Sequence, residues 1–258
     1  MMSGDAVSGG EERKHQDVRT TLLVFSYNEI EGMRAVMPQI DPTWVDQILV
    51  VDGGSTDGTI EYARESGYEV LIQKNPGLRN AYREAYPRIE GEIVIFFSPD
   101  GNSVASDIPR LVKKMKEGHD MVILSRYLPG ARSEDDTAIT RLGNKVFTGL
   151  INLLFGGSYT DAMIMYRAIR RELFEELGIF EDRIVERIFG HMICIIPLLS
   201  MRAAKARKRI AEIPGDEPAR VGGEGKCRHF TWGAIYLLEM LQEVIQWKIP
   251  RPPSLSAE

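Results

Sequence analysis

The sequence predicts an α/β fold in which a mostly parallel sheet is flanked by helices and followed by a helical C-terminal part. In the first half, short continuously apolar segments alternate with segments of helical character, as in a parallel sheet covered on both faces. Polar clusters directly follow several of these apolar segments, at the strand ends where open α/β sheets bind ligands. The second half instead shows amphipathic patterns with helical spacing.

The expected elements follow from this alternation in chain order. We expect strands at residues 21–25, 47–51, 69–72, 92–97 and 121–124, with helices between them at residues 30–40, 60–66, 79–88 and 107–116. In the second half we expect helices at residues 140–155 and 167–177, one or two helices within 184–207, and a strand at 208–213. A final amphipathic helix is predicted by apolar residues at helical spacing, namely Phe230, Ala234, Leu237, Leu238, Leu241 and Ile245.

The composition bounds the class of protein. The chain has 258 residues, of which 43% are hydrophobic and 27% charged, so it fits a globular domain with short extensions and not a disordered chain. The net charge of −5 gives no basic field for nucleic acid. Two cysteines, Cys194 and Cys227, are too few for a disulfide framework and fit a reducing compartment.

We divide the chain into four segments. Residues 1–19 are a polar, flexible leader without the apolar core of a secretory signal, and residues 20–228 are the α/β domain. Residues 229–249 are the amphipathic helix, and the Pro-rich residues 250–258 are a loose tail. No apolar run approaches the roughly 20 residues that a membrane-spanning helix needs.

The loop at residues 52–59 joins an expected strand to an expected helix. Its glycines let the backbone pass close to a ligand, and Asp52 is placed to accept hydrogen bonds from a nucleobase or a ribose. The alternative is a plain strand-to-helix turn capped by Thr56 or Asp57. The segment lacks the Gly-x-Gly-x-x-Gly spacing, which disfavours a dinucleotide-binding fold.

A series of short motifs resembles family 2 glycosyltransferases of the GT-A fold, in particular the dolichyl-phosphate mannose synthase-like branch. The similar segments are residues 25–29, 50–59, 75–81, 98–102, 125–127, 141–144, 160–161, 166–167, 212–214 and 220–226. Each motif is short, but their order and spacing across residues 20–228 are specific together. The resemblance implies an inverting enzyme that moves a sugar from a UDP- or GDP-sugar to a lipid-linked, polyprenyl-phosphate or glycan acceptor, as in cell-envelope glycan biosynthesis. It also implies a cytoplasmic protein, peripheral at the inner face of the membrane.

The same resemblance assigns the donor side of the site. Tyr27, Glu29, Asp52 and Gly54 are expected to bind the nucleoside, and Asp100 the diphosphate and its Mg²⁺ or Mn²⁺. The chain departs from the family pattern because Ser98 stands where the first acidic residue of the Asp-x-Asp element belongs. Asn102 offers a neutral oxygen nearby. The alternative for residues 98–102 is a plain type I turn, which the residues alone favour over a metal site.

The acceptor side and the leaving group are assigned to other residues. Arg220 and Lys226, in a glycine-rich loop, are expected to stabilise the leaving diphosphate. Arg126, Asp161 and Arg167 are expected to shape the sugar or acceptor pocket. Asp161 is a candidate base for a hydroxyl acceptor, whereas a phosphate acceptor is already anionic and needs none. A structural hydrogen-bonding carboxylate is the alternative for Asp161.

A basic run at Arg202, Lys205, Arg207, Lys208 and Arg209 follows an apolar segment at residues 192–201. This pairing suits a surface that rests on anionic lipid, and the alternative is a core helix with a solvated basic flank. Two other functions stay open at this point. They are a sugar nucleotidyltransferase, although its glycine-rich fingerprint is absent after the first strand, and a non-catalytic nucleotide- or lipid-binding relative.

Overall fold

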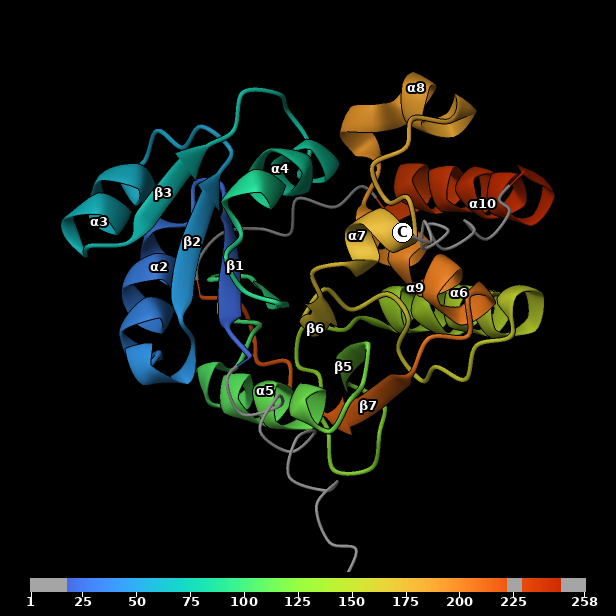
Figure 1. Ribbon diagram of the computed structural model, residues 1–258, viewed down its shortest axis with the longest axis horizontal. Helices are drawn as coiled ribbons and strands as arrows, with labels where there is room; N and C mark the ends of the chain where they lie inside the picture. Colours follow the sequence, from blue (N-terminus) through green and yellow to red (C-terminus); the bar gives the residue numbers. More distant parts are fainter. Residues whose placement is uncertain (1–17, 222–228, 247–258) are drawn as a thin grey trace, which may run out of the picture.

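The computed structural model describes residues 18–221 and 229–246 (Figure 1). These residues form a seven-stranded sheet of order β3-β2-β1-β4-β6-β5-β7. All neighbouring strands run parallel except β6, which is antiparallel to both β4 and β5. The strands are β1 (Thr20–Ser26), β2 (Gln47–Asp52), β3 (Glu69–Ile72), β4 (Ile93–Phe97), β5 (Met121–Ser125), β6 (Arg167–Arg170) and β7 (Ile210–Pro214).

Helices cover both faces of the sheet, as the sequence predicts. One face packs against α2 (Ile30–Val36), α3 (Thr59–Glu65) and α5 (Ile108–Lys116). The other packs against α4 (Leu78–Ala85), α6 (Ala138–Phe155), α7 (Leu173–Glu176) and α9 (Ile195–Lys205). The side chains of β1 alternate between the two cores, Leu22 and Val24 into the first and Leu23 and Phe25 into the second, so both faces are apolar.

Two further helices extend the second layer. Short α8 (Ile184–Phe189) and long α10 (His229–Gln246) contact each other, and α10 also contacts α6 and α9 (Figure 1). Five 3-10 turns complete the described chain, at Met37–Gln39, Pro42–Trp44, Tyr86–Arg88, Ala105–Asp107 and Gly190–Met192. In the described part of the chain, no helix is both long and apolar enough to cross a bilayer.

One predicted element is wrong. Residues 167–177 were expected to be a helix, but Arg167–Arg170 is strand β6 and only Leu173–Glu176 is helical. The strand fills the gap between β4 and β5, and its register pairs Ala168 with both Ile95 and Val122. The backbone groups of β4 and β5 that face each other's side of the sheet can both hydrogen-bond to an extended segment between them, which favours a strand here. A strand of four residues is too short to show a clear pattern in the sequence.

The apolar segment at residues 192–201 is core and not membrane surface. Helix α9 is buried from Ile195 to Ala204, and Arg202 is wholly buried in an ion pair with Glu243. The rest of the run is a solvated flank: Arg207 and Arg209 are exposed, although Lys208 pairs with Glu176 and Arg209 with Asp120. The core-helix alternative therefore describes this segment. The leader and the loose tail predicted for residues 1–19 and 250–258 lie outside the described residues, apart from Val18 and Arg19.

Candidate active site

The polar loops of the sheet meet at one edge. Because β1, β2, β4, β5 and β7 all run in the same direction, the loops that follow them emerge on the same side. Asp52 ends β2 and Asp100 follows β4, with only β1 between these strands, which separates the strand ends by about 10 Å. Arg126 follows β5 and Glu217 follows β7. The sequence prediction that these motifs share one edge is confirmed.

Asp52 anchors its own loop. Its buried carboxylate accepts hydrogen bonds from the hydroxyls of Ser26 (2.8 Å) and Ser55 (2.7 Å) and from the backbone N–H groups of Gly54 (2.8 Å) and Ser55 (2.7 Å). These four donors fill the acceptor capacity of the carboxylate. In this conformation Asp52 therefore shapes the loop at residues 52–59 and is shielded from the surface, which differs from the direct nucleoside contact expected from the sequence.

Neighbouring backbone groups tie the β1 and β2 loops together. The N–H of Asn28 donates to the Ser55 hydroxyl (2.8 Å), and the N–H of Thr56 donates to the Asn28 side-chain oxygen (2.9 Å). Asn28 has a φ of 50°, a left-handed conformation that asparagine tolerates well. Asp57 caps α3 by accepting from Thr59. Burial alone would raise the pKa of Asp57. The hydrogen bonds from Thr59 and from the Ile30 N–H outweigh this effect and lower the pKa.

The exposed rim of this loop pair carries Tyr27, Glu29 and Gly54. The Tyr27 side chain is 49% exposed, and its ring lies so close to Gly53 that a Cβ there would sit 3.0 Å from the ring. Gly54 has a φ of 90°, which a side chain would strain. Glu29 lines a cavity of about 240 Å³ together with Asn28, Asp57 and Val221. These residues are thus at least partly exposed to solvent, in contrast to Asp52.

Asp100 lies at the centre of an oxygen-rich turn. Its carboxylate is buried, accepts from the Asn102 N–H (3.1 Å) and forms an ion pair with the Arg220 guanidinium (2.9 Å). Arg220 also lies 3.5 Å from Asp135, and Asn102 donates its side-chain N–H to the same Asp135. The Val221 N–H donates to the Asp100 carbonyl oxygen (2.8 Å), so the loop that carries Arg220 is docked on this turn.

The donor set of this turn fits a hard divalent cation. Among the described residues, no group of three or more His, Cys, Asp or Glu side chains is arranged to hold a metal. The side-chain oxygen of Asn102, however, is buried without any hydrogen-bond partner beside the Asp100 carboxylate. A carboxylate and an orphaned amide oxygen are ligands that Mg²⁺ and Mn²⁺ accept, with substrate phosphates completing the shell. Ser98 adds no charge, so Asp100 supplies the carboxylate among residues 98–102.

Arg126, Asp161 and Glu217 form a buried charge network beside this turn. The Asp161 carboxylate is wholly buried and accepts from Arg126 Nε (2.7 Å), Arg126 Nη2 (3.1 Å) and Asn144 Nδ2 (2.7 Å). Arg126 reaches Glu217 as well (3.1 Å). Burial disfavours the charged guanidinium, but the two carboxylates outweigh it and raise the pKa of Arg126. Asp161 therefore holds Arg126 in place, and its side chain is shielded from the surface.

Arg167 does not reach the site. Its guanidinium is wholly buried and donates to the carbonyl oxygens of Ala162 and Ile164 and to the Ser200 hydroxyl. Burial lowers the pKa of Arg167. The expected contact with sugar or acceptor is therefore replaced by a structural role, the support of residues 162–164 behind Asp161. Lys226, expected to stabilise the leaving group, lies outside the described residues.

A cavity of about 460 Å³ adjoins the charge network, and the residues that line it were not predicted from the sequence. It lies between α6 and the residues after β5, and Tyr127, Arg141, Lys145, Thr148, Tyr159 and Thr160 are among its lining residues. Arg141 and Lys145 are one helical turn apart, so both cations lie on the same side of α6. The sequence identifies residues 141–144 as one of the similar motifs, but no pattern in it predicts that they lie next to residues 159–160.

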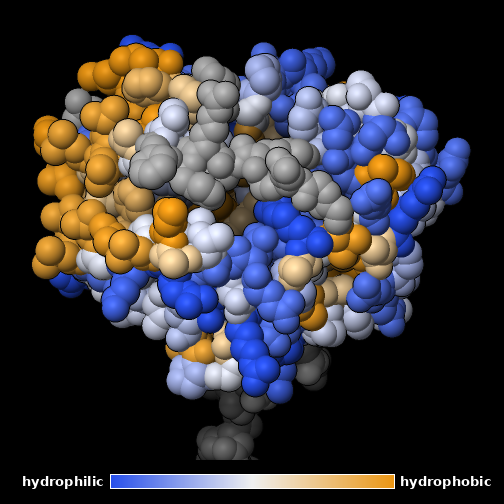
Figure 2. Space-filling model, turned by 180° about the vertical axis from the view of Figure 1, so that it is seen from behind, coloured by the Kyte–Doolittle hydropathy of each residue, from blue (hydrophilic) through white to orange (hydrophobic). Residues whose placement is uncertain are grey.

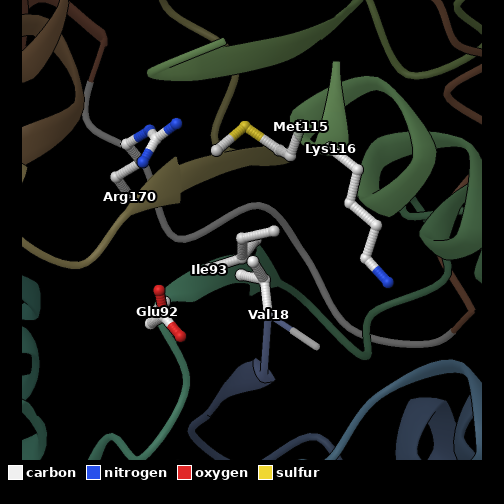
Figure 3. Close-up of a pocket in the computed structure, with 6 residues that line it drawn as sticks. All are labelled: Val18, Glu92, Ile93, Met115, Lys116 and Arg170. Atoms are coloured by element: carbon white, nitrogen blue, oxygen red, sulfur yellow. The ribbon is translucent and has the colours of Figure 1, made fainter. Parts of the chain in front are cut away.

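One of the cavities at the opposite edge of the sheet is very small. It measures about 30 Å³ and lies among Val18, Glu92, Ile93, Met115, Lys116 and Arg170 (Figure 3). Figure 3 shows Arg170 and Lys116 on opposite sides of Met115. A cavity of this size holds about one water molecule. Two other cavities at that edge measure about 310 and 280 Å³. The cavity beside Arg141 and Lys145 is larger than both and adjoins the loops after the strands, so it is the better candidate for a substrate.

Comparison with known proteins adds a family match and several relatives. The model of the glycosyl transferase family 2 matches residues 23–178. Glycosyltransferase AglJ of Haloferax volcanii is 33% identical over 165 residues, which cover 62% of this chain and about half (53%) of AglJ. An uncharacterized glycosyltransferase of Mycobacterium tuberculosis is 29% identical over 245 residues, 95% of this chain and 100% of its own length. A dolichol-phosphate mannosyltransferase of Pyrococcus furiosus is 25% identical over 241 residues, 90% of this chain and 65% of its own.

Solved structures show a shared fold. Glucosyl-3-phosphoglycerate synthase of Mycobacterium tuberculosis, solved with Mn²⁺, UDP and phosphoglyceric acid, matches with a TM-score of 0.64 at 20% sequence identity. The match covers 96% of this chain and 86% of that one. A second structure of the same enzyme contains Mg²⁺ and UDP, with a TM-score of 0.64 and 20% identity over 97% of this chain and 87% of that one. At this identity the likeness concerns the fold alone.

Proposed function

We propose a specific reaction for this chain, which belongs to glycosyl transferase family 2. The predicted family and the predicted GT-A fold are confirmed, and the chain is a glycosyltransferase. The sugar nucleotidyltransferase and the non-catalytic relative are therefore set aside. The proposed reaction is the inverting transfer of a sugar from a UDP- or GDP-sugar to an anionic, lipid-linked acceptor such as a polyprenyl phosphate.

The donor half of the proposal depends on the turn at Asp100. Asp100 and Asn102 would hold Mg²⁺ or Mn²⁺, which would neutralise the charge that develops on the leaving diphosphate. Arg220 is already placed on Asp100 and can turn from this carboxylate to the phosphates. Lys226, six residues later in the sequence, is proposed to act on the same phosphates. Tyr27, Glu29 and Gly54 would contact the nucleoside, while Asp52 keeps their loop in shape. The known relatives solved with UDP and Mn²⁺ or Mg²⁺ support a nucleotide and a divalent cation here.

The acceptor half depends on the cavity beside Arg141 and Lys145. The cations Arg141 and Lys145 line it, and their charge-assisted hydrogen bonds suit a phosphate group. The hydroxyls of Tyr127 and Thr160 already donate to Asp136 and Glu212. Burial of Asp161 against Arg126 leaves no exposed carboxylate of that residue to act as base. A phosphate oxygen is nucleophilic without deprotonation, so this arrangement favours a phosphate over a sugar hydroxyl. A relative of this chain is named a dolichol-phosphate mannosyltransferase, and others are named undecaprenyl-phosphate transferases.

The single observation that carries the proposal is the buried Asp100 carboxylate beside the orphaned oxygen of Asn102. The test is calorimetric titration of the chain and of Asp100→Asn with UDP and GDP, with and without Mn²⁺. We expect one nucleotide to bind in the presence of Mn²⁺ and the variant to lose at least about tenfold in affinity, because its anionic ligand is gone. Asp120→Asn, at the opposite edge of the sheet, is the matched control. Equal affinity of Asp100→Asn and the parent chain would refute the assignment.

Transfer itself is tested with the donor sugar that matches the bound nucleotide. The enzyme should transfer to undecaprenyl phosphate in detergent and not to undecaprenol, since only the former carries the anion. Transfer to a free glycan instead would refute the phosphate acceptor and leave the donor assignment intact.

A further inference from the structure

Helix α10 turns its apolar side outward. Its solvent-exposed residues include Leu237, Leu238, Leu241, Val244 and Ile245, and the last is 71% exposed. Its charged residues, Glu239 and Glu243, are wholly buried. This is the reverse of a helix on the surface of a protein in water, where the apolar stripe faces the core. The amphipathic helix predicted from the sequence is therefore present, but its leucine-rich side does not face the sheet.

The helices beside α10 repeat this inversion. On α6 the polar Asn144 and Thr148 are buried, whereas Ile139, Leu142, Val146, Leu153 and Leu154 are exposed. On α8 Glu186 is buried, whereas Ile184 and Ile188 are exposed. We call the exposed apolar side chains of α6, α8 and α10 the apolar face. In the part of the chain that the structure describes, all exposed large apolar residues except Tyr27, Ile72 and Val221 belong to it.

The apolar face is continuous on one flank of the molecule. Helix α10 contacts both α6 and α8, and Phe147 of α6 packs edge-on against Tyr236 of α10. Figure 2 shows apolar side chains gathered on the left flank of its view, which corresponds to the side of α6 and α10 in Figure 1. A patch of this kind on a water-soluble surface marks an interaction site.

The charges of the same helices are sorted by sign. Glu186, Glu239 and Glu243, the acidic residues within α6, α8 and α10, are all buried. Glu243 is neutralised by Arg202 (2.7 Å) and Arg183 (3.0 Å). The exposed charged residues of these helices are basic: Arg141 and Lys145 on α6 and Arg187 on α8. Exposed Glu181 and Asp182 stand just before α8, so it is along the helices themselves that cations edge the apolar face. An apolar face with cations along its helices is complementary to the headgroups and acyl chains of an anionic bilayer.

We propose that the apolar face rests on the surface of a phospholipid bilayer that contains anionic lipid, without crossing it. From the sequence we expected lipid contact at the basic run of residues 202–209, whereas this proposal places the contact on α6, α8 and α10. The cavity with Arg141 and Lys145 lies on α6 beside Leu142 and Val146, so an amphiphile held there would have its chain directed along the face. The binding itself requires neither donor nor acceptor and can be tested apart from the proposed reaction.

The experiment is co-sedimentation of the full chain with vesicles, in the absence of nucleotide. Vesicles of phosphatidylcholine alone are compared with vesicles that contain 30% phosphatidylglycerol. The test variant is Leu238→Ser/Leu241→Ser/Ile245→Ser, and its matched control is Ile72→Ser, which removes an exposed isoleucine on β3, outside the face. Arg187→Gln tests the contribution of charge. Far-ultraviolet circular dichroism and thermal unfolding establish that each variant is folded.

We expect the chain and Ile72→Ser to bind the anionic vesicles, and the triple variant to bind them at least about tenfold more weakly. Arg187→Gln should weaken binding about threefold on anionic vesicles only. The proposal is overturned if the parent chain does not bind anionic vesicles, or if the folded triple variant binds as well as Ile72→Ser. It is also overturned if the parent chain is a dimer that ignores vesicles and the triple variant is a monomer, because the face would then join two copies. Loss of vesicle binding with retained Mn²⁺-dependent nucleotide binding would separate this inference from the donor assignment.

Discussion

Replacement of Asp161 by asparagine distinguishes a structural carboxylate from a catalytic base. The Asp161 carboxylate is wholly buried and accepts two side-chain hydrogen bonds from Arg126 and one from Asn144. An asparagine keeps one oxygen, but its amide N–H₂ then points at groups that are themselves donors. Arg126 is left with Glu217 as its remaining anionic partner in the network. The change therefore breaks a buried ion pair without a substitute.

The magnitude follows from the burial of the pair. Removal of one partner of a buried ion pair costs about 3–5 kcal/mol, because the other charge stays desolvated. We expect the free energy of unfolding of Asp161→Asn to fall by about 3 kcal/mol in reversible urea denaturation at pH 7.5. For a chain of this size the corresponding drop in Tm is on the order of 10 °C.

A double-mutant cycle with Arg126→Gln provides the control. If the two side chains act as a pair, the double variant should be less destabilised than the sum of the single variants, with a coupling energy of about 2 kcal/mol. A base that contacts only the acceptor predicts the opposite pattern: Asp161→Asn would abolish transfer and leave stability within about 0.5 kcal/mol of the parent. That result would refute the positioning role.

Two further predictions concern other parts of the fold. Burial, together with the charges of Glu186 and Glu243, raises the pKa of Glu239 well above its usual value, and neither of its oxygens has a hydrogen-bond partner. Since the folded pKa is the higher one, the fold should lose stability as the pH rises above about 4.5, where the unfolded chain ionises. Glu239→Gln should therefore raise Tm at pH 8 and leave it nearly unchanged at pH 4.5; an equal shift at both values would contradict this. Gly32→Ala would place a Cβ 2.3 Å from the Pro99 carbonyl oxygen. We expect it to destabilise the chain by about 1–3 kcal/mol and to weaken Mn²⁺-dependent nucleotide binding, whereas Gly143→Ala, with open space around it in α6, should not weaken it.

The strands and the loops after them could be predicted from the sequence because each carries its signal locally. A parallel strand buried on both faces is a continuous apolar run, as at residues 21–25, whatever the rest of the chain does. The placement of Asp52 and Asp100 at one edge then followed from the direction of parallel strands. The final helix could likewise be predicted from its spacing alone.

Other features depended on contacts that no local pattern records. Strand β6 forms because β4 and β5 both have backbone groups free to hydrogen-bond with a strand placed between them. Arg167 can be buried because the carbonyl oxygens of residues 162 and 164 accept hydrogen bonds from its guanidinium. The ion pair of Arg220 with Asp100 joins residues that are far apart in the sequence. Periodicity revealed that α10 has an apolar side, but only the packing of Glu239 and Glu243 against the protein showed that this side faces outward. A repeat of apolar residues fixes which residues share a face of a helix, while the medium that the face meets is decided by the surrounding tertiary structure.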